Sequence, residues 1–409
     1  MTTQDRPAEG LAHNPEFRSY LWASAYAGMA LAMQQLLLSW LLIGVLKLPA
    51  DQVGLIQAII GIPGLALMLA GGASADRRDA RSLLIWLYLV APVFPIALIF
   101  AEQWYGLNVL WVMIWGLGIS VVQSYSMPGQ QAIMNRIAGD KVQQGVTAAT
   151  AIGFVVQVVG LTLAGLIDSL GIAPVLICQA IALALAGFMT SRISVSRTPP
   201  TPTSVSAWQG IKEGLAATGE HPVIFQVLTI NFVSSIFNAG SFFTVFPFIV
   251  KRVYDGDAWL LAVLMAVFFI GGALSNIVLL RFQPLRRPGQ LFLVMQLSRM
   301  VVLWLMWIEP GFWLMVLATV GWGLNMGVTS NLARSIVQES APKPFLGRIL
   351  AVFSISMVGS APIGAVVLGW IIERFGTLNA LLPAMLLSVA LFIYGVFFSK
   401  VWGYESKSD

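Results

Sequence analysis

Long stretches of apolar residues, separated by short polar segments, dominate this chain. Each stretch is close to the ~20 residues that a helix needs to cross the hydrocarbon core, where backbone groups must be satisfied within the helix. The short alternating segments of a transmembrane barrel are not visible. The pattern predicts an all-α membrane protein with twelve spans, at 18–46, 53–75, 82–100, 106–127, 146–167, 173–191, 223–250, 257–280, 289–308, 310–332, 346–372 and 377–399.

The predicted spans form two groups of six, which we take as an N-terminal half at 1–191 and a C-terminal half at 223–409. A shift of 204 residues aligns GLTLAGLID, from Gly160, with GAVVLGWII, from Gly364. The shared glycines and the equal number of spans favour an internal repeat. Many transporters contain such a repeat, with the substrate site at the interface between its copies.

A polar segment at 192–222 joins the two halves. Its first part is rich in Pro, Thr and Ser, a composition typical of a flexible spacer. In its second part, Trp208, Ile211 and Leu215 recur at helical spacing. This spacing predicts a short helix, either amphipathic and lying on the membrane surface or a plain solvated linker helix.

Composition and charge support a membrane location and give an orientation. Hydrophobic residues make up 58% of the chain and charged residues only 10%, against roughly 25% charged in soluble domains. Of the 23 Lys and Arg residues, one lies within a span and most others lie on the side of the termini, whereas the opposite side has only Lys47, Lys251, Arg252 and Arg374. Because Lys and Arg concentrate on the cytoplasmic side, both termini are predicted to be cytoplasmic. We expect a multi-pass protein of the bacterial cytoplasmic (inner) membrane, with no removable signal peptide and no nucleic-acid partner.

The segment GGASADRRDAR, at 71–81, places five charges between two apolar spans. It resembles the loop between helices two and three of the major facilitator superfamily, which reads Gly, three residues, Asp-Arg, one residue, Gly-Arg and then Arg or Lys. Asp79 stands where the second Gly is usual, and Ala80 replaces the first of the two final basic residues. The matching positions are Gly72, Asp76, Arg77 and Arg81.

The resemblance extends over the whole chain. NPEFRSYLW, SMPGQQAI and the EG of IKEGL look like the branch that contains bacterial siderophore and macrolide exporters. It implies two pseudo-symmetric six-helix halves and a secondary active transporter that exports a small amphiphilic molecule by alternating access, as a monomer. An importer or facilitator of a small organic anion is the alternative. A membrane-embedded enzyme and a non-transporting sensor are the rival classes.

The family loop implies a conformational latch at this charged segment. Asp76 would face the start of helix eleven, near Phe345, where unpaired amides favour a carboxylate. Arg77 and Arg81 would hold that carboxylate ionised and oriented. The simpler interpretation is that these charges only anchor the topology.

In the family, helices one, four, seven and ten line the central cavity, and each of these helices has amide side chains here. The most informative pattern is on helix seven, where polar residues recur at i, i+3, i+4 and i+7 and form a stripe at membrane depth. Such residues can also join helices through hydrogen bonds. The candidate cavity residues are Gln34, Gln35, Gln123, Asn231, Ser234, Ser235, Asn238 and Asn325. Four tryptophans on helices four and ten also suit flat organic molecules, namely Trp111, Trp115, Trp313 and Trp322.

Arg299 is a charge within a span. Helix nine is predicted to start near Pro288, which places Arg299 about 16 Å deep, near the bilayer midplane. A charged residue at this depth is by default a candidate functional residue, and the guanidinium of Arg299 would suit an anionic ligand. Pairing with backbone carbonyls or with a polar group on a neighbouring helix is an equally good account.

Titratable and catalytic groups are sparse. The acids near spans, Glu102, Asp168, Glu309 and Glu373, lie at span ends, and both histidines lie outside the spans. Proton coupling is therefore implied by the resemblance but lacks a deep acid. Gly160 is followed by Leu161 where the antiporter pattern has Pro. No phosphate-binding Gly-rich loop and no cluster of metal ligands is visible, so we expect neither an enzyme nor a bound cofactor or metal.

The orientation can be tested by labelling. In a Cys178→Ser background, cysteine at Asp255 should react with an impermeant maleimide in intact cells, because the loop at 251–257 is predicted to be external. Cysteine at Arg197 should react only after the cells are permeabilised. The opposite pattern of labelling would reverse the predicted orientation.

Overall fold

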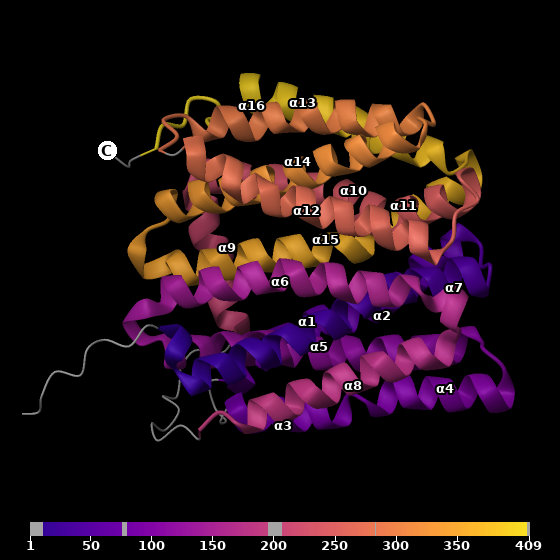
Figure 1. Cartoon of the computed structure of the whole chain (residues 1–409). Helices are drawn as coiled ribbons and strands as arrows, with labels where there is room; N and C mark the ends of the chain where they lie inside the picture. The colour runs from indigo at the N-terminus through magenta and orange to yellow at the C-terminus, as the bar shows by residue number, and fades with distance from the viewer. Residues whose placement is uncertain (1–10, 76–79, 195–206, 283, 407–409) are drawn as a thin grey trace, which may run out of the picture. The chain divides into compact units, whose positions relative to one another are not determined.

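The computed structural model describes residues 11–75, 80–194, 207–282 and 284–406 (Figure 1). Within these ranges the regular structure is helical. The helices of the first part of the chain are α1 (Pro15–Trp40), α2 (Ala50–Ala75), α3 (Ala80–Val90), α4 (Val93–Tyr105), α5 (Val109–Ala138), α6 (Val142–Gly165), α7 (Ile167–Leu170) and α8 (Ile172–Ser191). Those of the second part are α9 (Ala207–Glu220), α10 (Pro222–Gly240), α11 (Phe246–Phe248), α12 (Ala258–Phe282), α13 (Pro288–Trp307), α14 (Phe312–Ser340), α15 (Leu346–Phe375) and α16 (Leu382–Phe397).

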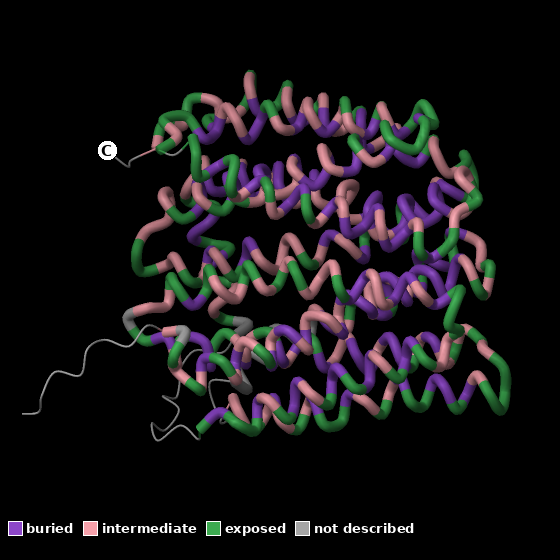
Figure 2. Tube along the Cα trace, viewed as in Figure 1, coloured by how far each residue is buried: buried purple, intermediate pink, exposed green. Residues whose placement is uncertain are grey.

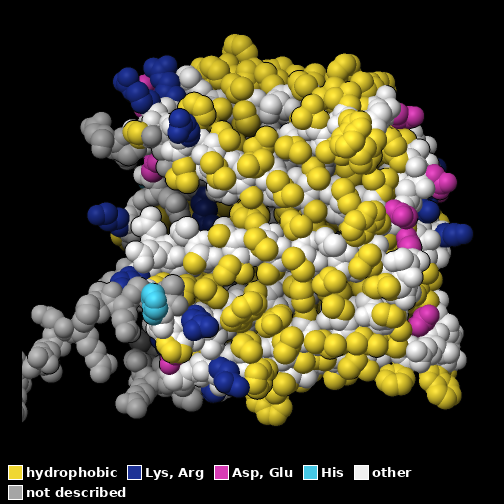
Figure 3. Space-filling model, viewed as in Figure 1, with side chains coloured by type: hydrophobic (Ala, Val, Ile, Leu, Met, Phe, Trp, Pro, Cys, Tyr) yellow, Lys and Arg dark blue, Asp and Glu magenta, His cyan; other side chains and the backbone are white. Residues whose placement is uncertain are grey.

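The helices confirm the predicted all-α membrane fold. Among the described residues, eleven helical stretches are long and apolar enough to cross a membrane, and α2 adds a further apolar helix. On the face shown in Figure 3, hydrophobic side chains cover the flanks of the helices and the charged side chains lie near their ends. In Figure 2, exposed residues occur at the turns between helices and also along the helices themselves.

Some helices differ from the predicted spans at their ends. α5 and α14 continue to Ala138 and Ser340, well past the apolar runs that end near 127 and 332. The end of an apolar run indicates where a helix leaves the bilayer. The helix itself continues, with its backbone hydrogen bonds, until it reaches a residue that terminates helices. The third predicted span is two helices, α3 and α4, which are separated by a turn at Ala91 and Pro92.

Contacts divide the chain into two compact units that differ from the predicted halves. Unit 1 contains 1–35 and 66–204, and unit 2 contains 36–65 and 205–409. In unit 1, α3 and α4 pack against α5 and α8. In unit 2, α10 packs against α15, α12 against α14, and α13 against α14 and α16. The end of α1 and the start of α2 therefore belong with the C-terminal helices.

The aligned glycines of the repeat have the same structural role in both units. A Cβ atom at Gly160 would lie 2.5 Å from the Met29 carbonyl oxygen, so α6 packs closely on α1. A Cβ at Gly364 would overlap the Ile236 carbonyl, so α15 packs as closely on α10. Helices in a membrane approach each other closely where a small residue leaves room for the neighbouring backbone. The two glycines therefore make equivalent contacts in the two pseudo-symmetric halves, α6 with α1 and α15 with α10.

The predicted linker helix is present as α9, and it packs on α15. Glu213 forms an ion pair with Arg348 at 2.7 Å. A Cβ at Gly214 would lie 2.8 Å from the Arg348 carbonyl oxygen. Ala217 is buried, whereas Leu215, from the predicted apolar face, is 55% exposed. The helix meets α15 through its small residues, because these allow the two backbones to approach.

Close packing of α12 and α14 also depends on glycine. A Cβ at Gly323 would overlap the carbonyl of Phe268, and one at Gly327 would overlap the Ser275 hydroxyl. Gly323→Val should therefore destabilise unit 2 by about 1–3 kcal/mol, the usual effect of overpacking. Thermal unfolding of the purified protein would show this as a lower Tm. Gly153→Ala is the control, because a Cβ at Gly153 meets nothing within 4 Å. An unchanged Tm for Gly323→Val would contradict the packing argument.

Candidate functional site

The polar stripe of α10 lines a cavity in unit 2. The cavity has a volume of about 320 Å³, at the lower end of the range for small-molecule sites. All four stripe residues, Asn231, Ser234, Ser235 and Asn238, contribute to its wall, together with Arg299 from α13. Asn231 and Ser234 are only 3% and 4% exposed. Helical spacing therefore brings these side chains to one face, and packing places that face on the cavity.

Neutral groups hold the guanidinium of Arg299. Its Nη1 donates to the Ser234 hydroxyl, and its Nε donates to Asn325 Oδ1 at 3.3 Å. The Asn325 amide nitrogen donates in turn to the Met295 carbonyl at 2.5 Å and to the Ser298 hydroxyl at 2.6 Å. Asn325, predicted to line the cavity, is not among the cavity-lining residues, and it orients Arg299 from behind.

An aromatic cluster forms another part of the cavity wall. The Phe242 and Phe268 rings stack with centroids 3.9 Å apart, and Phe269 meets both rings edge-on. Trp322, which is fully buried, packs edge-on against Phe242 and donates its indole N–H to Asn238 Oδ1 at 2.7 Å. This bond leaves the amide nitrogen of Asn238 as a donor. The cavity thus combines polar groups from α10 and α13 with a wall of rings.

Buried polar atoms at the cavity lack partners among the described residues. Asn231 Nδ2 and Thr329 Oγ1 have no hydrogen-bond partner there, and both residues line the cavity. Leaving a buried donor unsatisfied costs about 1–3 kcal/mol. A bound molecule with hydrogen-bond acceptors would satisfy Asn231.

The predicted amides of helix one join helices within unit 1. Gln34 Oε1 accepts from Gln179 of α8 at 3.1 Å, and Gln35 Oε1 accepts from Gln157 of α6 at 3.1 Å. Gln179 is fully buried and also accepts from the Trp115 indole at 3.1 Å. These contacts match the alternative in which polar residues link helices. Gln123, on α5, is exposed.

The remaining tryptophan candidates lie near helix ends. Trp111 lies in the first turn of α5 and stacks on Tyr105, and Trp313 lies in the first turn of α14 and is 80% exposed. Such positions are typical of interfacial anchors. Neither residue lines the cavity of unit 2.

A hydrogen-bond network in unit 2 connects the ends of α1 and α2 to the chain beside the cavity. Pro247 has no N–H, so the Phe243 carbonyl four residues earlier lacks its α-helical donor. Ser39 Oγ at 3.3 Å and Gln57 Nε2 at 3.2 Å donate to this carbonyl. Thr244 Oγ1 completes the network by donating to Gln57 Oε1 at 2.7 Å. Phe243 also lines the cavity, so the network lies next to it.

The start of α2 is bound to α15 in the same unit. Glu373 accepts a hydrogen bond from the Ala50 backbone N–H at 3.0 Å and lies 3.6 Å from the Arg252 guanidinium. A carboxylate at a helix N-terminus is favourable, because unpaired amides give that end a partial positive charge. One turn further along, the glycines Gly54 and Gly369 let the two backbones meet, since either Cβ would lie 3.2–3.3 Å from the other Cα. These two glycines therefore let α2 and α15 pack closely.

The proposed latch is described only in part. Asp76 and Arg77 lie outside the described residues, and Gly72 lies within α2. Arg81 donates from Nε to the Ile193 carbonyl at 2.5 Å and from Nη2 to the Ser191 carbonyl at 2.8 Å. The end of a helix has carbonyls without intrahelical donors, and Arg81 supplies donors there. A role in capping α8 was not predicted from the sequence.

Four glutamines that take part in these networks were not predicted as site residues. They are Gln57, Gln157, Gln179 and Gln296. Each lies within an apolar run, which is a signal in itself, since an amide at membrane depth needs partners. Gln296 lies one turn before Arg299 and accepts from Ser234 at 3.2 Å.

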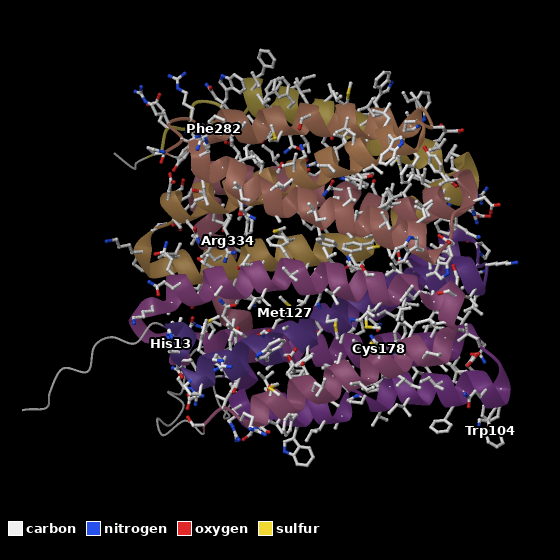
Figure 4. All side chains as sticks on the ribbon, in the orientation of Figure 1. His13, Trp104, Met127, Cys178, Phe282 and Arg334 are labelled. Atoms are coloured by element: carbon white, nitrogen blue, oxygen red, sulfur yellow. The ribbon has the colours of Figure 1, made fainter. Side chains whose placement is uncertain are left out.

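In the described part of the chain, no group of His, Cys, Asp and Glu side chains is placed to bind a metal. Figure 4 shows the free Cys178 on α8, and Arg334, an exposed cation, on α14.

Comparison with known proteins identifies the family to which these features belong. The family model described as Major Facilitator Superfamily matches residues 20–365. A comparison of the sequence with curated proteins found no match.

Solved structures of transporters share the fold. The nucleoside transporter NupG is 13% identical, with a TM-score of 0.72 over 95% of this chain and 99% of NupG. A POT family transporter in complex with 5-aminolevulinic acid is 12% identical, with a TM-score of 0.73 over 94% and 96%. A bacterial homolog of the human lysosomal transporter Spinster is 15% identical, with a TM-score of 0.59 over 94% and 96%. At these identities the likeness shows the fold alone.

Proposed function

We propose a specific role for this chain, which belongs to the Major Facilitator Superfamily and has the fold of a membrane transporter. It is a secondary active transporter that exports a small amphiphilic molecule, of siderophore or drug-like character, across the bacterial inner membrane. The observation that carries this proposal is the cavity of unit 2, where the polar stripe of α10 faces a wall of phenylalanine rings. Such a cavity suits a molecule with one polar and one apolar end.

Alternating access needs contacts that can be broken at low energetic cost. The network around the Phe243 carbonyl has this character, because it consists of single hydrogen bonds from Ser39, Gln57 and Thr244. An interhelical hydrogen bond in a membrane contributes about 0.6 kcal/mol on average. Since the network joins the ends of α1 and α2 to the chain beside the cavity, its breakage would let these ends move away. This arrangement supports a gate on the predicted external side.

Export and proton coupling follow from the resemblance to drug and siderophore exporters. The alternative is uptake or facilitated movement through the same site. Purified protein in liposomes separates these functions, because flux can be measured with a pH gradient of either polarity and with none. Flux that requires an opposing proton gradient supports a proton-coupled exporter. Equal flux without a gradient supports facilitation.

The cavity itself can be tested by removing its polar groups. Asn231→Leu and Asn238→Leu should each reduce transport and weaken substrate binding about five- to tenfold, because each removes a hydrogen bond to the substrate. Asn276→Leu on α12 is the matched control, since Asn276 pairs with Asn331 and lies outside the cavity. If both cavity variants lose stability but keep the affinity of wild type, the stripe joins helices and does not bind substrate.

The charged segment at 71–81 yields a separate prediction. Asp76→Asn should impair transport far more than Asp79→Asn, because the family pattern places only Asp76 against a helix N-terminus. The Asp76 variant should remain folded, since such a contact contributes about 1–2 kcal/mol. Transport is compared at matched expression, with gel filtration as the check of folding. Equal activity of the two variants would mean that the charged segment only anchors the membrane topology.

A further inference from the structure

We infer that the ligand of the unit 2 cavity is an amphiphilic organic anion, with a carboxylate bound by Arg299 and Asn231 and an apolar ring system packed on Phe242, Phe268 and Phe269. The inference rests on the proposed transport function and adds the charge and shape of the transported molecule.

The first argument is the charge balance of the cavity wall. Arg299 is 4% exposed, and both of its hydrogen-bond partners, Ser234 and Asn325, are neutral. The ion pairs of the described residues lie elsewhere, and none includes Arg299. A charge buried at membrane depth is expensive, and it is normally paired with an opposite charge or a set of backbone carbonyls. The cavity wall therefore has a positive charge that no described acidic side chain compensates, and an anionic ligand would neutralise it.

The second argument is the placement of free donors. The described hydrogen bonds of Arg299 use Nε and Nη1, so the donors on Nη2 remain for a ligand. Asn231 lies one helical turn before Ser234, which itself contacts Arg299, and its buried Nδ2 has no partner among the described residues. Two donor groups at neighbouring positions suit the two oxygens of one carboxylate. A neutral amide or ester would accept fewer and weaker hydrogen bonds there.

The third argument concerns the rest of the ligand. The rings of Phe242, Phe268 and Phe269 present faces and edges, a surface that suits a flat aromatic or other apolar body. The volume of about 320 Å³ limits this body to a small ring system. A cation would meet the guanidinium without a compensating acid, so the same site rejects it.

A purely structural role for Arg299 makes a different prediction. Arg299 joins α13 to α10 through Ser234 and to α14 through Asn325. If this were its only role, removing the charge would lower stability, and acidic and neutral ligands would be affected equally. The relative affinity for a matched acid and amide therefore separates the two roles.

The experiment measures Kd by calorimetry for 1-naphthylacetate and its neutral analogue 1-naphthylacetamide. Wild type should prefer the acid by about tenfold or more, the effect of a charge-assisted hydrogen bond. Arg299→Gln should abolish this preference while binding of the amide stays within about twofold. Arg334→Gln is the matched control, because it removes an exposed positive charge on α14 that does not line the cavity. Its acid-to-amide ratio should equal that of wild type.

A second variant covers the case in which Arg299→Gln does not fold. Asn231→Asp keeps Arg299 and places a carboxylate beside it, so it should weaken binding of the acid selectively. An unchanged acid-to-amide ratio in both cavity variants, or folded wild type that binds neither probe, overturns the inference. Liposome flux distinguishes this failure from failure of the proposed function. If neutral compounds are transported with no preference for acids, only the inferred anionic ligand is wrong. If no compound shows protein-dependent flux, the proposed transport function is wrong.

Discussion

The absence of water in the hydrocarbon layer is the constraint on which the rest of this structure depends. Every polar group at membrane depth must find a partner in the protein, because an unsatisfied group costs several kcal/mol. The buried amide of Gln179 obeys this rule. Gln179 bonds to Gln34, Trp115 and the Ala30 carbonyl, so three groups of two other helices are bound through one side chain.

Two of the exceptions to this rule among the described residues line the cavity of unit 2. Asn231 and Thr329 keep unpartnered polar atoms, and Arg299 is held only by neutral groups. All three line the same space, next to a cluster of aromatic rings. In a core built only for stability these positions would be apolar or fully paired. Retaining them is consistent with a site that a ligand completes, and the proposed function follows from this difference between the networks.

Backbone geometry links the site to the ends of the helices. Pro247 removes the donor for the Phe243 carbonyl, and Ser39 and Gln57 replace it from α1 and α2. Side-chain bonds to a released carbonyl are easier to exchange than the bonds within a helix, because breaking them does not unwind the helix. Small residues allow the same elements to pack tightly, as at Gly54 and Gly369. Tight but weakly bonded contacts of this kind suit a transporter that must change conformation.

The sequence by itself determined that the elements are membrane-spanning helices and where most of them lie, because a span needs an uninterrupted apolar run and a helix shows its polar stripe at fixed spacing. It also singled out Arg299 and the α10 stripe, since a charge or a row of polar residues at membrane depth is unusual on any single helix. Only the tertiary structure decided which polar residues face the cavity. Gln34 and Gln35 look like Asn231 in the sequence, yet they bond to Gln179 and Gln157, and Asn325 lies behind Arg299. The physical reason is that the partner of a buried amide comes from another helix, and the packing of helices far apart in the sequence determines which helix that is.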